Sequence, residues 1–358
     1  MKALIRFEFR KILTKRTAVA AMTAIMLLSV LYGVSTFQNM YAYDGKDAEG
    51  SGKTAVEIDK RLAAKYEGVL TDEKVHQMMS EFKPNRDLHG LNAKYLYSNA
   101  LQSAVFYYFS DLDGNWNGLN VADVFGDQEI KIGYVNGWLH TSQNMIRIFL
   151  FLSFAIILLI APVFSGEYSG VDQIILSSRY GKTKCAAAKI IASFLSAIFV
   201  IFLVAALNLL LALAAYGTEG LDASVLFAPT DFSGAYIPFN ISCGTVLMYQ
   251  ILLAFMGAIG VTGITLIFSA VCKNQLAAFA ISAVVYAIPI MLPIRETSAL
   301  YKLVVLMPLY CVQCTSALSV KQMGNGMLYA VWAVPVAILL AMLGAVISQG
   351  RFIKHQVS

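Results

Sequence analysis

Charged residues are scarce in this chain. Asp, Glu, Lys and Arg make up only 14% of its 358 residues, and 58% are hydrophobic, whereas a usual soluble domain is about 25% charged. Uncharged apolar stretches of roughly 20 residues recur, and a helix of that length crosses a bilayer. The composition therefore excludes an ordinary water-soluble protein and predicts an all-α polytopic membrane protein with about six transmembrane helices.

Ionisable side chains are almost absent from the apolar stretches. A proton-coupled transporter needs a titrating carboxylate or histidine near the membrane centre, and an intramembrane hydrolase needs acids, bases or metal ligands there. Lys189 lies near a predicted span end, where it can extend to the membrane surface. The four histidines lack the close spacing of a metal site. We expect no catalytic residue, metal or cofactor on this chain, so the energy for transport would come from another subunit.

Cysteines are also few. The five of them are too scattered for a disulfide framework. Cys311 and Cys314 form a C-x-x-C pair without the strand and helix pattern of a redox protein, which leaves a structural disulfide or two unreacted thiols as interpretations. The basic residues behind the net charge of +5 lie beside the ends of apolar stretches. They indicate topology, and we do not expect nucleic acid as a partner.

The apolar runs predict six spans, which cover residues 17–37, 144–164, 186–216, 244–271, 276–294 and 327–348. Basic residues stay on the cytoplasmic side, and here they precede the first run, separate the second from the third, and follow the fourth and the last. We therefore expect a multi-pass protein of the cell membrane with both termini in the cytoplasm. Pro308 interrupts the apolar segment 303–320, which we interpret as a re-entrant or interfacial pair of short helices; a seventh span is the alternative.

Two polar segments flank the first span. Residues 1–16 place basic and apolar positions at helical spacing, as in an amphipathic helix that lies in the cytoplasmic membrane interface. Residues 38–143 carry more carboxylates than basic residues and show stretches of helical periodicity. We expect this segment to form a small, mainly helical extracytoplasmic domain. The remainder, 144–358, would hold the five further spans.

Two motifs in the polar segment resemble ligand sites but lack required residues. Residues 50–54 read Gly-Ser-Gly-Lys-Thr, as in a phosphate-binding loop, but Asp47 stands where the pattern needs Gly. Residues 111–117 alternate Asp and Asn as in the first half of a calcium loop, but Trp116 replaces the required Gly and Ala122 the required Glu. Turns without a ligand are the preferred interpretation of both.

The loop at residues 165–185 is the most informative cytoplasmic segment. Gly166 and Gly170 bracket a turn. Val171, Ile174 and Ile175 can form one apolar face of a short helix, and basic residues follow. We interpret the loop as a docking surface for a partner, with an ordinary basic connector as the alternative.

Two segments resemble the membrane subunit of a type-2 ATP-binding-cassette exporter, the group of drug, polysaccharide and lantibiotic-immunity exporters. The opening segment contains an aromatic-acidic-aromatic triplet, Phe7-Glu8-Phe9, followed by Arg10 and Lys11. The cytoplasmic segment contains Phe164, Glu167, Gly170, Leu176, Ser178-Arg179 and Ala188-Lys189, which is similar to the family's signature around its coupling helix. Six spans with an enlarged first outer loop are similar to the family's architecture.

The resemblance implies that this chain is a permease subunit and not an enzyme. A separate ATPase would bind ATP and Mg and couple to the chain through Glu167, Tyr168, Val171, Ile174 and Arg179, supported by Phe7, Glu8, Phe9 and Arg10 of the interfacial helix. Two permease subunits would pair within the membrane lipid. The expelled compound would be an amphipathic peptide, an antibiotic or a lipid-like molecule, and no individual substrate-binding residue is indicated.

Two other functions stay open. A membrane-anchored sensor or assembly factor would bind a ligand with the outer domain and would not transport it. A polytopic membrane enzyme would use acidic residues of the same domain, of which Asp111 and Asp113 are the best candidates. A neighbouring reading frame that encodes a nucleotide-binding subunit would argue against the sensor.

Overall fold

The computed structural model describes residues 1–83, 99–168, 181–228, 239–292, 294–295, 298–312 and 329–354, and these are mostly helical. Within them, five helices are long and apolar enough to cross a membrane: Arg16–Asn39, Asn136–Ser165, Thr183–Tyr216, Cys243–Val271 and Val331–Lys354. The remaining predicted span corresponds to α12 (Gln275–Met291), a shorter apolar helix of 17 residues. Such a helix is about 26 Å long, less than the roughly 30 Å of a bilayer core. The described residues thus give five long spans where we expected six.

The described chain divides into two compact units. The first comprises Met1–Ser29, Ile146–Leu207 and Gln250–Ser358, and the second comprises Val30–Met145 and Asn208–Tyr249. Each unit is therefore assembled from segments that are far apart in the sequence.

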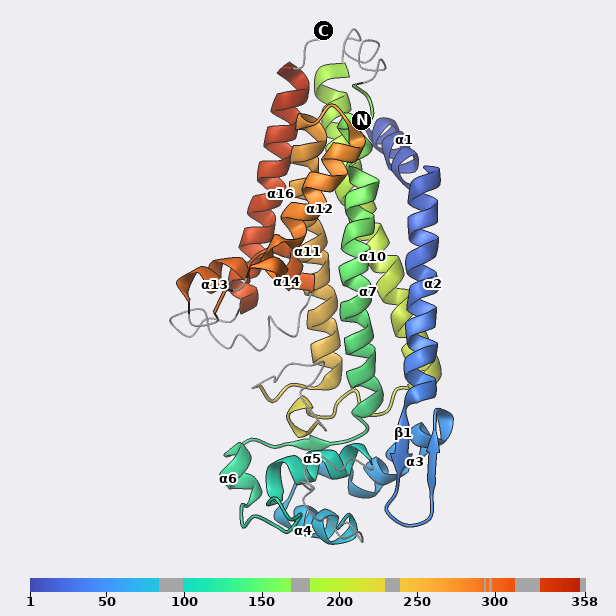
Figure 1. Ribbon diagram of the computed structural model, residues 1–358, viewed down its shortest axis with the longest axis vertical. Helices are drawn as coiled ribbons and strands as arrows, with labels where there is room; N and C mark the ends of the chain where they lie inside the picture. The colour runs from blue at the N-terminus through green and yellow to red at the C-terminus, as the bar shows by residue number, and fades with distance from the viewer. Residues whose placement is uncertain are drawn as a thin grey trace. The chain divides into compact units, whose positions relative to one another are not determined.

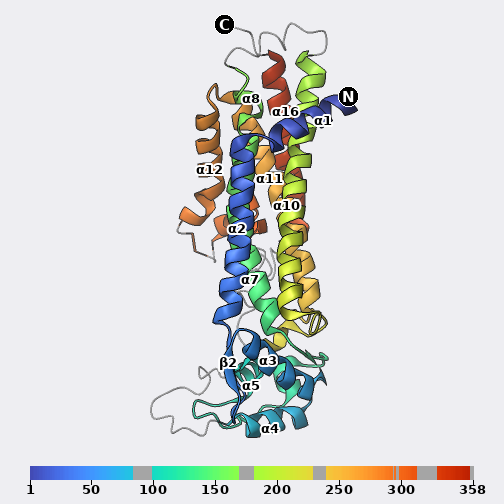
Figure 2. The ribbon, with the colours of Figure 1, turned by 90° about the vertical axis from the view of Figure 1, so that its right-hand side faces the viewer.

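The first unit contains helices and no strands among the residues that the structure describes. Its elements, whole or in part, are α1 (Lys2–Leu13), α2 (Arg16–Asn39), α7 (Asn136–Ile160), α8 (Pro162–Ser165), a π-helical turn (Gly181–Cys185), α10 (Ala186–Tyr216), α11 (Cys243–Val271), α12, α13 (Ala299–Val304), α14 (Pro308–Val312) and α16 (Tyr329–Lys354). Figure 1 and Figure 2 show the long helices α7, α10, α11 and α16 with roughly aligned axes. Figure 1 also shows α1 as a short helix set at an angle to α2.

Close backbone contact joins α11 to α16. A Cβ added at Gly263 would lie 2.3 Å from the carbonyl oxygen of Leu340, and one added at Gly344 would lie 2.3 Å from the carbonyl oxygen of Gly263. Both positions therefore have room only for glycine. Small residues that let two helix backbones approach are typical of packing within membranes, where lipid contacts are as apolar as the helices themselves.

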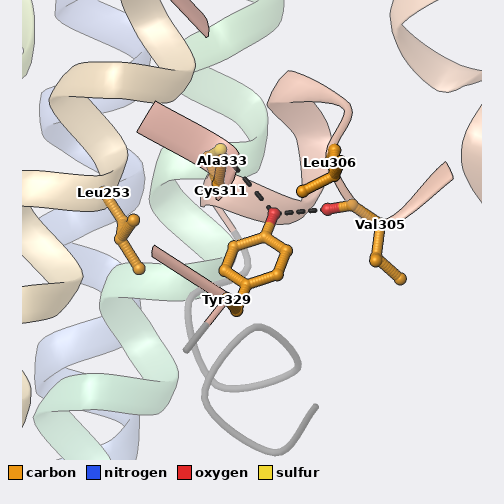
Figure 3. Packing of buried hydrophobic residues seen from close by; sticks show 6 residues of the cluster. All are labelled: Leu253, Val305, Leu306, Cys311, Tyr329 and Ala333. Carbon is orange, nitrogen blue, oxygen red and sulfur yellow. Dashed lines mark hydrogen bonds between the residues drawn. The ribbon is translucent and has the colours of Figure 1, made fainter. Parts of the chain in front are cut away.

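In the described part of the segment 303–320, α13 ends at Val304 and α14 begins at Pro308, and residues 313–320 lie outside the described residues. Figure 3 shows the apolar cluster that holds this pair: Leu253 of α11, Val305, Leu306 and Cys311, and Tyr329 and Ala333 of α16. The Tyr329 hydroxyl donates a hydrogen bond to the Val305 carbonyl and lies 3.8 Å from the Cys311 sulfur. Two short helices are therefore found here, but the first begins at Ala299, before the predicted segment, and the re-entrant or interfacial placement of the pair stays a prediction. Cys314, the second member of the C-x-x-C pair, is not among the described residues.

The second unit combines helices with two small hairpins. Its elements outside the long helices are β1 (Tyr41–Tyr43), β2 (Glu49–Ser51), α3 (Lys53–Tyr66), β3 (Gly68–Val69), α4 (Asp72–Glu81), α5 (Ala100–Phe109), α6 (Val121–Phe125), β4 (Lys131–Ile132) and a 3-10 turn (Val225–Phe227). β1 pairs antiparallel with β2, with Tyr41 opposite Ser51, and β3 pairs antiparallel with β4, with Gly68 opposite Ile132. Neither sheet exceeds two strands.

The polar part of the second unit has its own apolar core. Buried residues at helical spacing come from three helices: Ile58 and Leu62 of α3, Val75 and Met78 of α4, and Phe106 and Phe109 of α5. The Gln102 side chain inside this core donates to the Phe82 carbonyl at 3.0 Å, which satisfies a buried polar group. The mainly helical character predicted for residues 38–143 agrees with these elements.

The first ligand-like motif, residues 50–54, joins strand β2 to helix α3, and the second forms a turn. Lys53 begins α3 after the short strand β2, and its ammonium group pairs with Glu57 at 3.6 Å on an exposed face. The Asp111 carboxylate accepts the backbone N–H groups of Asp113 and Asn115 at 2.9 and 2.8 Å, as in a turn closed by its own aspartate. Within the described ranges no group of three or more His, Cys, Asp or Glu could hold a metal ion.

Candidate functional site

Four charged side chains meet inside the first unit. The Lys189 ammonium of α10 donates to Glu8 Oε2 of α1 at 3.1 Å and to Glu167 Oε1, beyond α8, at 2.5 Å. The Lys11 ammonium of α1 also donates to Glu167 Oε1, at 2.5 Å, and lies 3.8 Å from Glu8 Oε2. We call Glu8, Lys11, Glu167 and Lys189 the ion network. It contains two positive and two negative charges and is therefore neutral as a whole.

The ion network is largely closed to solvent. Lys189 is 0% exposed, and Glu8 and Glu167 are each 4% exposed. Moving such charges from water into a protein interior costs several kcal/mol per ion, roughly, and the cost is offset only when partners and hydrogen bonds are well placed. Removal of one member would leave an uncompensated buried charge, so the four side chains have to act as a set.

Helix α1 presents the network through its periodicity. Glu8 and Ile12 are one turn apart and share the buried face, and Lys11 is beside them. Phe7 is 61% exposed on the other side of the helix. The helix ends at Leu13, and the backbone N–H of the capping residue Thr14 bonds to the Arg10 carbonyl. Glu8 and Lys11 of the amphipathic helix predicted for residues 1–16 thus face the interior of the first unit.

A tight turn positions Glu167. Pro162 begins α8, and the Gly166 and Glu167 N–H groups bond to the carbonyls of Pro162 and Phe164 at 3.2 and 3.0 Å. A Cβ at Gly166 would lie only 2.6 Å from the Pro162 carbonyl oxygen, so this turn excludes larger residues. The sequence Pro-x-x-x-Gly-Glu therefore fixes the backbone position from which the Glu167 side chain extends.

The end of α11 anchors the same turn. The Phe164 N–H bonds to Ser269 Oγ at 2.9 Å, and the Tyr168 hydroxyl donates to the Ala270 carbonyl at 2.8 Å. Ala270 belongs to the last turn of α11, where carbonyls have no helical partner. The Phe164 ring also packs against Phe352 of α16, with ring centroids 5.1 Å apart. The segment from Pro162 to Tyr168 thus touches two long helices besides joining the ion network.

The pKa values of Lys11 and Lys15 differ because their charged neighbours differ. The pKa of Lys11 is raised: burial lowers it, but the hydrogen bond to Glu167 and the charges of Glu167 and Glu8 together outweigh burial. The pKa of Lys15, next along the chain, is lowered by burial and by the cationic Lys11 and Lys189. Lys11, which two carboxylates face, is thus stabilised in its charged form, whereas Lys15 is not.

The structure brings together only some of the predicted site residues. Glu8 and Glu167 meet in the ion network, Tyr168 holds α11, and the Phe9 ring packs edge-on against Phe199 of α10 at 5.9 Å. Phe7 and Arg10 are exposed and take no part in the network. Val171, Ile174 and Arg179 lie outside the described residues.

Lys189 corrects one sequence interpretation. We expected this residue to extend to the membrane surface, but its side chain is fully buried between two carboxylates, since ion pairing offsets the loss of water. Lys11 was not predicted as a partner of Glu167 either. Glu8 and Lys11 stand three apart, which puts them on one helix face, and this spacing was the available signal.

A family model described as "ABC-2 family transporter protein" matches residues 2–307. The chain belongs to the ABC-2 transporter family. This makes it a multi-pass membrane permease of the ABC transporter class, whose general partner is an ATP-binding-cassette protein. All four residues of the ion network lie within the matched range. Comparison of this ABC-2 permease with curated proteins and with solved structures finds no match.

Proposed function

We propose that this ABC-2 permease forms the membrane pathway of an exporter that expels an amphipathic peptide, antibiotic or lipid-like compound. Family membership supports a permease, and the sequence resemblance supports export. A separate ATPase subunit binds ATP and Mg and hydrolyses the nucleotide, so the permease itself is not an enzyme. Two permease chains pair to complete the pathway.

The ion network is the observation that carries the coupling part of this proposal. Glu167 stands at the start of the loop 165–185, which we assign to ATPase docking, and its Oε1 binds lysines of both α1 and α10. Its Oε2 is buried and has no hydrogen-bond partner within the described residues. A displacement of the loop therefore acts on α1 and α10 together, because moving Glu167 alone would separate buried opposite charges.

The proposed topology places both termini in the cytoplasm and the polar part of the second unit outside the cell. Basic residues support this orientation: Arg6, Arg10 and Lys11 occur in α1, and Arg351 and Lys354 occur in the last turn of α16. Lys and Arg in short segments next to spans stay on the cytoplasmic side.

A cavity in the second unit supports an amphipathic cargo. Its volume is about 290 Å³, and its walls are mainly apolar, with Val34, Phe37 and Leu211 among them. Asn144 and Asn208 are its buried amides, and Asn144 Oδ1 accepts a hydrogen bond from Thr36. Mostly apolar walls with a few polar groups are typical of small-molecule sites. We propose that cargo passes this cavity.

Co-purification tests the proposal. The permease is purified in detergent with the ATPase encoded beside it, as the native chain, as Glu167→Gln and as Glu57→Gln. Glu57 is an exposed glutamate of α3 in the second unit, so its variant controls for the loss of one carboxylate. We expect the ATPase to remain with the native chain and the control, and to be reduced with Glu167→Gln.

A charge-balanced variant separates coupling from folding. In Lys11→Gln/Glu167→Gln, the Glu8 and Lys189 pair remains and the buried charge still sums to zero. We expect this variant to fold like the native chain in size-exclusion chromatography, yet to respond to cargo with weaker ATPase stimulation. If no ATPase accompanies the native chain, the exporter loses its energy source, and a sensor or assembly factor becomes the better explanation.

A further inference from the structure

A groove runs along one side of α1 in the first unit. It has a volume of about 600 Å³ and is lined by residues of α1, α10 and α11: Lys2, Ile5, Arg6, Phe9, Leu195, Ile198, Phe199, Phe202 and Phe255. Nearly all of the lining is apolar side chain, with Lys2 and Arg6 as the charged members. The groove is separate from the ion network, since none of the four network residues lines it.

The apolar floor is long enough for a hydrocarbon chain. Leu195, Ile198, Phe199 and Phe202 recur at helical spacing on α10 and are all partly exposed. Leu195 and Phe202 are seven residues apart, which is about 10 Å along a helix. The Phe9 ring rests edge-on against Phe199 and so closes the floor toward α1.

The charges of the groove are all of one sign. Lys2 and Arg6 are one turn apart on α1, on the same face as Ile5 and Phe9. Both are exposed, and neither is paired with a carboxylate within the part of the chain that the structure describes. Lys11, on the neighbouring face, is by contrast occupied by Glu167. The two cations are therefore available to an anion that lies over the apolar floor.

We propose that this groove binds an anionic phospholipid, with the acyl chain along α10 and the phosphate between Lys2 and Arg6. The charge complementarity favours a lipid that joins a negative headgroup to a hydrocarbon chain. A zwitterionic lipid such as phosphatidylcholine also carries a phosphate, but its own ammonium group offsets that charge, so it complements the two cations less well. The bound lipid stabilises the position of α1 relative to α10, and thereby makes the permease sensitive to the anionic lipid content of its membrane.

Spin-labelled lipids test this site. The full-length chain is reconstituted in phosphatidylcholine bilayers, and electron paramagnetic resonance measures the immobilised fraction of spin-labelled phosphatidylglycerol and of spin-labelled phosphatidylcholine. We expect the native chain to prefer phosphatidylglycerol by more than about tenfold at the site, because each basic residue near an anionic surface contributes roughly fivefold. Lys2→Gln/Arg6→Gln should lose this preference.

Two controls decide between the site and a general charge effect. Arg16→Gln/Lys273→Gln removes two exposed cations that do not line the groove, and it should keep the native preference. Phe202→Ala should release the lipid, whereas Leu210→Ala, at another exposed position of α10, should not. Equal immobilisation of the two lipids by the native chain overturns the proposal, as does an equal loss in the Arg16/Lys273 control. If Phe202→Ala instead lowers the dimer fraction in light scattering, a second copy occupies the groove.

Discussion

Both units of the molecule bury carboxylates, but they stabilise them in different ways. In the first unit, Glu8 and Glu167 are paired with Lys11 and Lys189. In the second unit, Asp59 of α3 is 3% exposed, and its donors among the described residues are neutral: the Ala100 N–H at 3.1 Å and the Asn136 amide at 2.7 Å. The first unit pairs its buried carboxylates with lysines, whereas the second surrounds Asp59 with uncharged hydrogen-bond donors.

The difference appears in the protonation of Asp59. Burial raises its pKa to about 6, and the hydrogen bonds from Asn136 and Ala100 only partly oppose that rise. The neighbouring Lys60 pairs instead with Glu219 at 3.2 Å and lies over the Tyr134 ring. A carboxyl of this kind can lose or gain a proton near neutral pH. In the ion network, by contrast, each buried carboxylate faces a lysine.

The largest expected effect comes from breaking the network at its centre. Lys189→Met keeps most of the length of the side chain but leaves Glu8 and Glu167 with Lys11 as their only cation among the described residues. We expect a loss of about 3–5 kcal/mol in the free energy of unfolding, the size found when one partner of a buried pair is removed. Thermal unfolding in detergent measures it. Lys273→Met, at an exposed position, is the control, and an equal melting temperature for both variants would contradict a stabilising network.

The next effect concerns pH and the second unit. Between about pH 4 and 6 the folded protein keeps a proton on Asp59 that the unfolded chain has lost, so stability falls as pH rises through this interval and levels off above it. A difference of about two in pKa corresponds to about 3 kcal/mol. Asp59→Asn should remove this dependence.

Tryptophan fluorescence follows the pH effect, because Trp116 and Trp138 belong to the second unit. The matched control is Asp127→Asn, which replaces an exposed aspartate of the same unit. Parallel pH profiles for the native chain and Asp59→Asn would show that Asp59 is not the titrating group.

Hydropathy predicted the helices of this molecule better than their ends. The third span was expected at 186–216, and α10 has those bounds; the fourth was expected at 244–271, and α11 begins one residue earlier. α7 begins at Asn136, eight residues before the predicted span, because its first turns are polar and look like loop. α16 likewise continues to Lys354, beyond the predicted end at Ser348.

The candidate site was less accessible to sequence reasoning. Glu8 and Lys189 are 181 positions apart, and Lys11 and Glu167 are 156 apart. Their separate segments could be selected by resemblance, but only the packing of α1 beside α10 and the turn after α8 shows that the charges meet. Lysine near a span end fits both a surface position and a buried pair, so the pattern around Lys189 could not distinguish them.

A smaller loss of stability should follow when both members of one ion pair are replaced by apolar residues, because the remaining buried charges then balance. Glu8→Met/Lys189→Met removes the pair as a whole and leaves Lys11 with Glu167. Because well-packed apolar replacements of a buried pair are often neutral or stabilising, we expect the double variant to recover about 2 kcal/mol relative to Lys189→Met alone, within the usual coupling range of contacting residues. Thermal unfolding of the four members of this double-mutant cycle gives the coupling energy. Additive losses would mean that Glu8 and Lys189 do not interact.

The smallest effect tests a neutral contact beside the network. Tyr168→Phe removes the hydroxyl that donates to the Ala270 carbonyl and keeps the ring. We expect a loss of about 1 kcal/mol, typical of one neutral hydrogen bond. We also expect a larger fractional loss of cargo-stimulated ATPase activity, because Tyr168 holds to α11 the loop that we propose docks the ATPase, while the ion network stays intact. Tyr249→Phe, at an exposed position of the second unit, provides the comparison. If both substitutions leave ATPase stimulation unchanged, coupling passes through the charged contacts of Glu167 alone, and the contrast between the two units rests on charge and not on the anchoring of the loop.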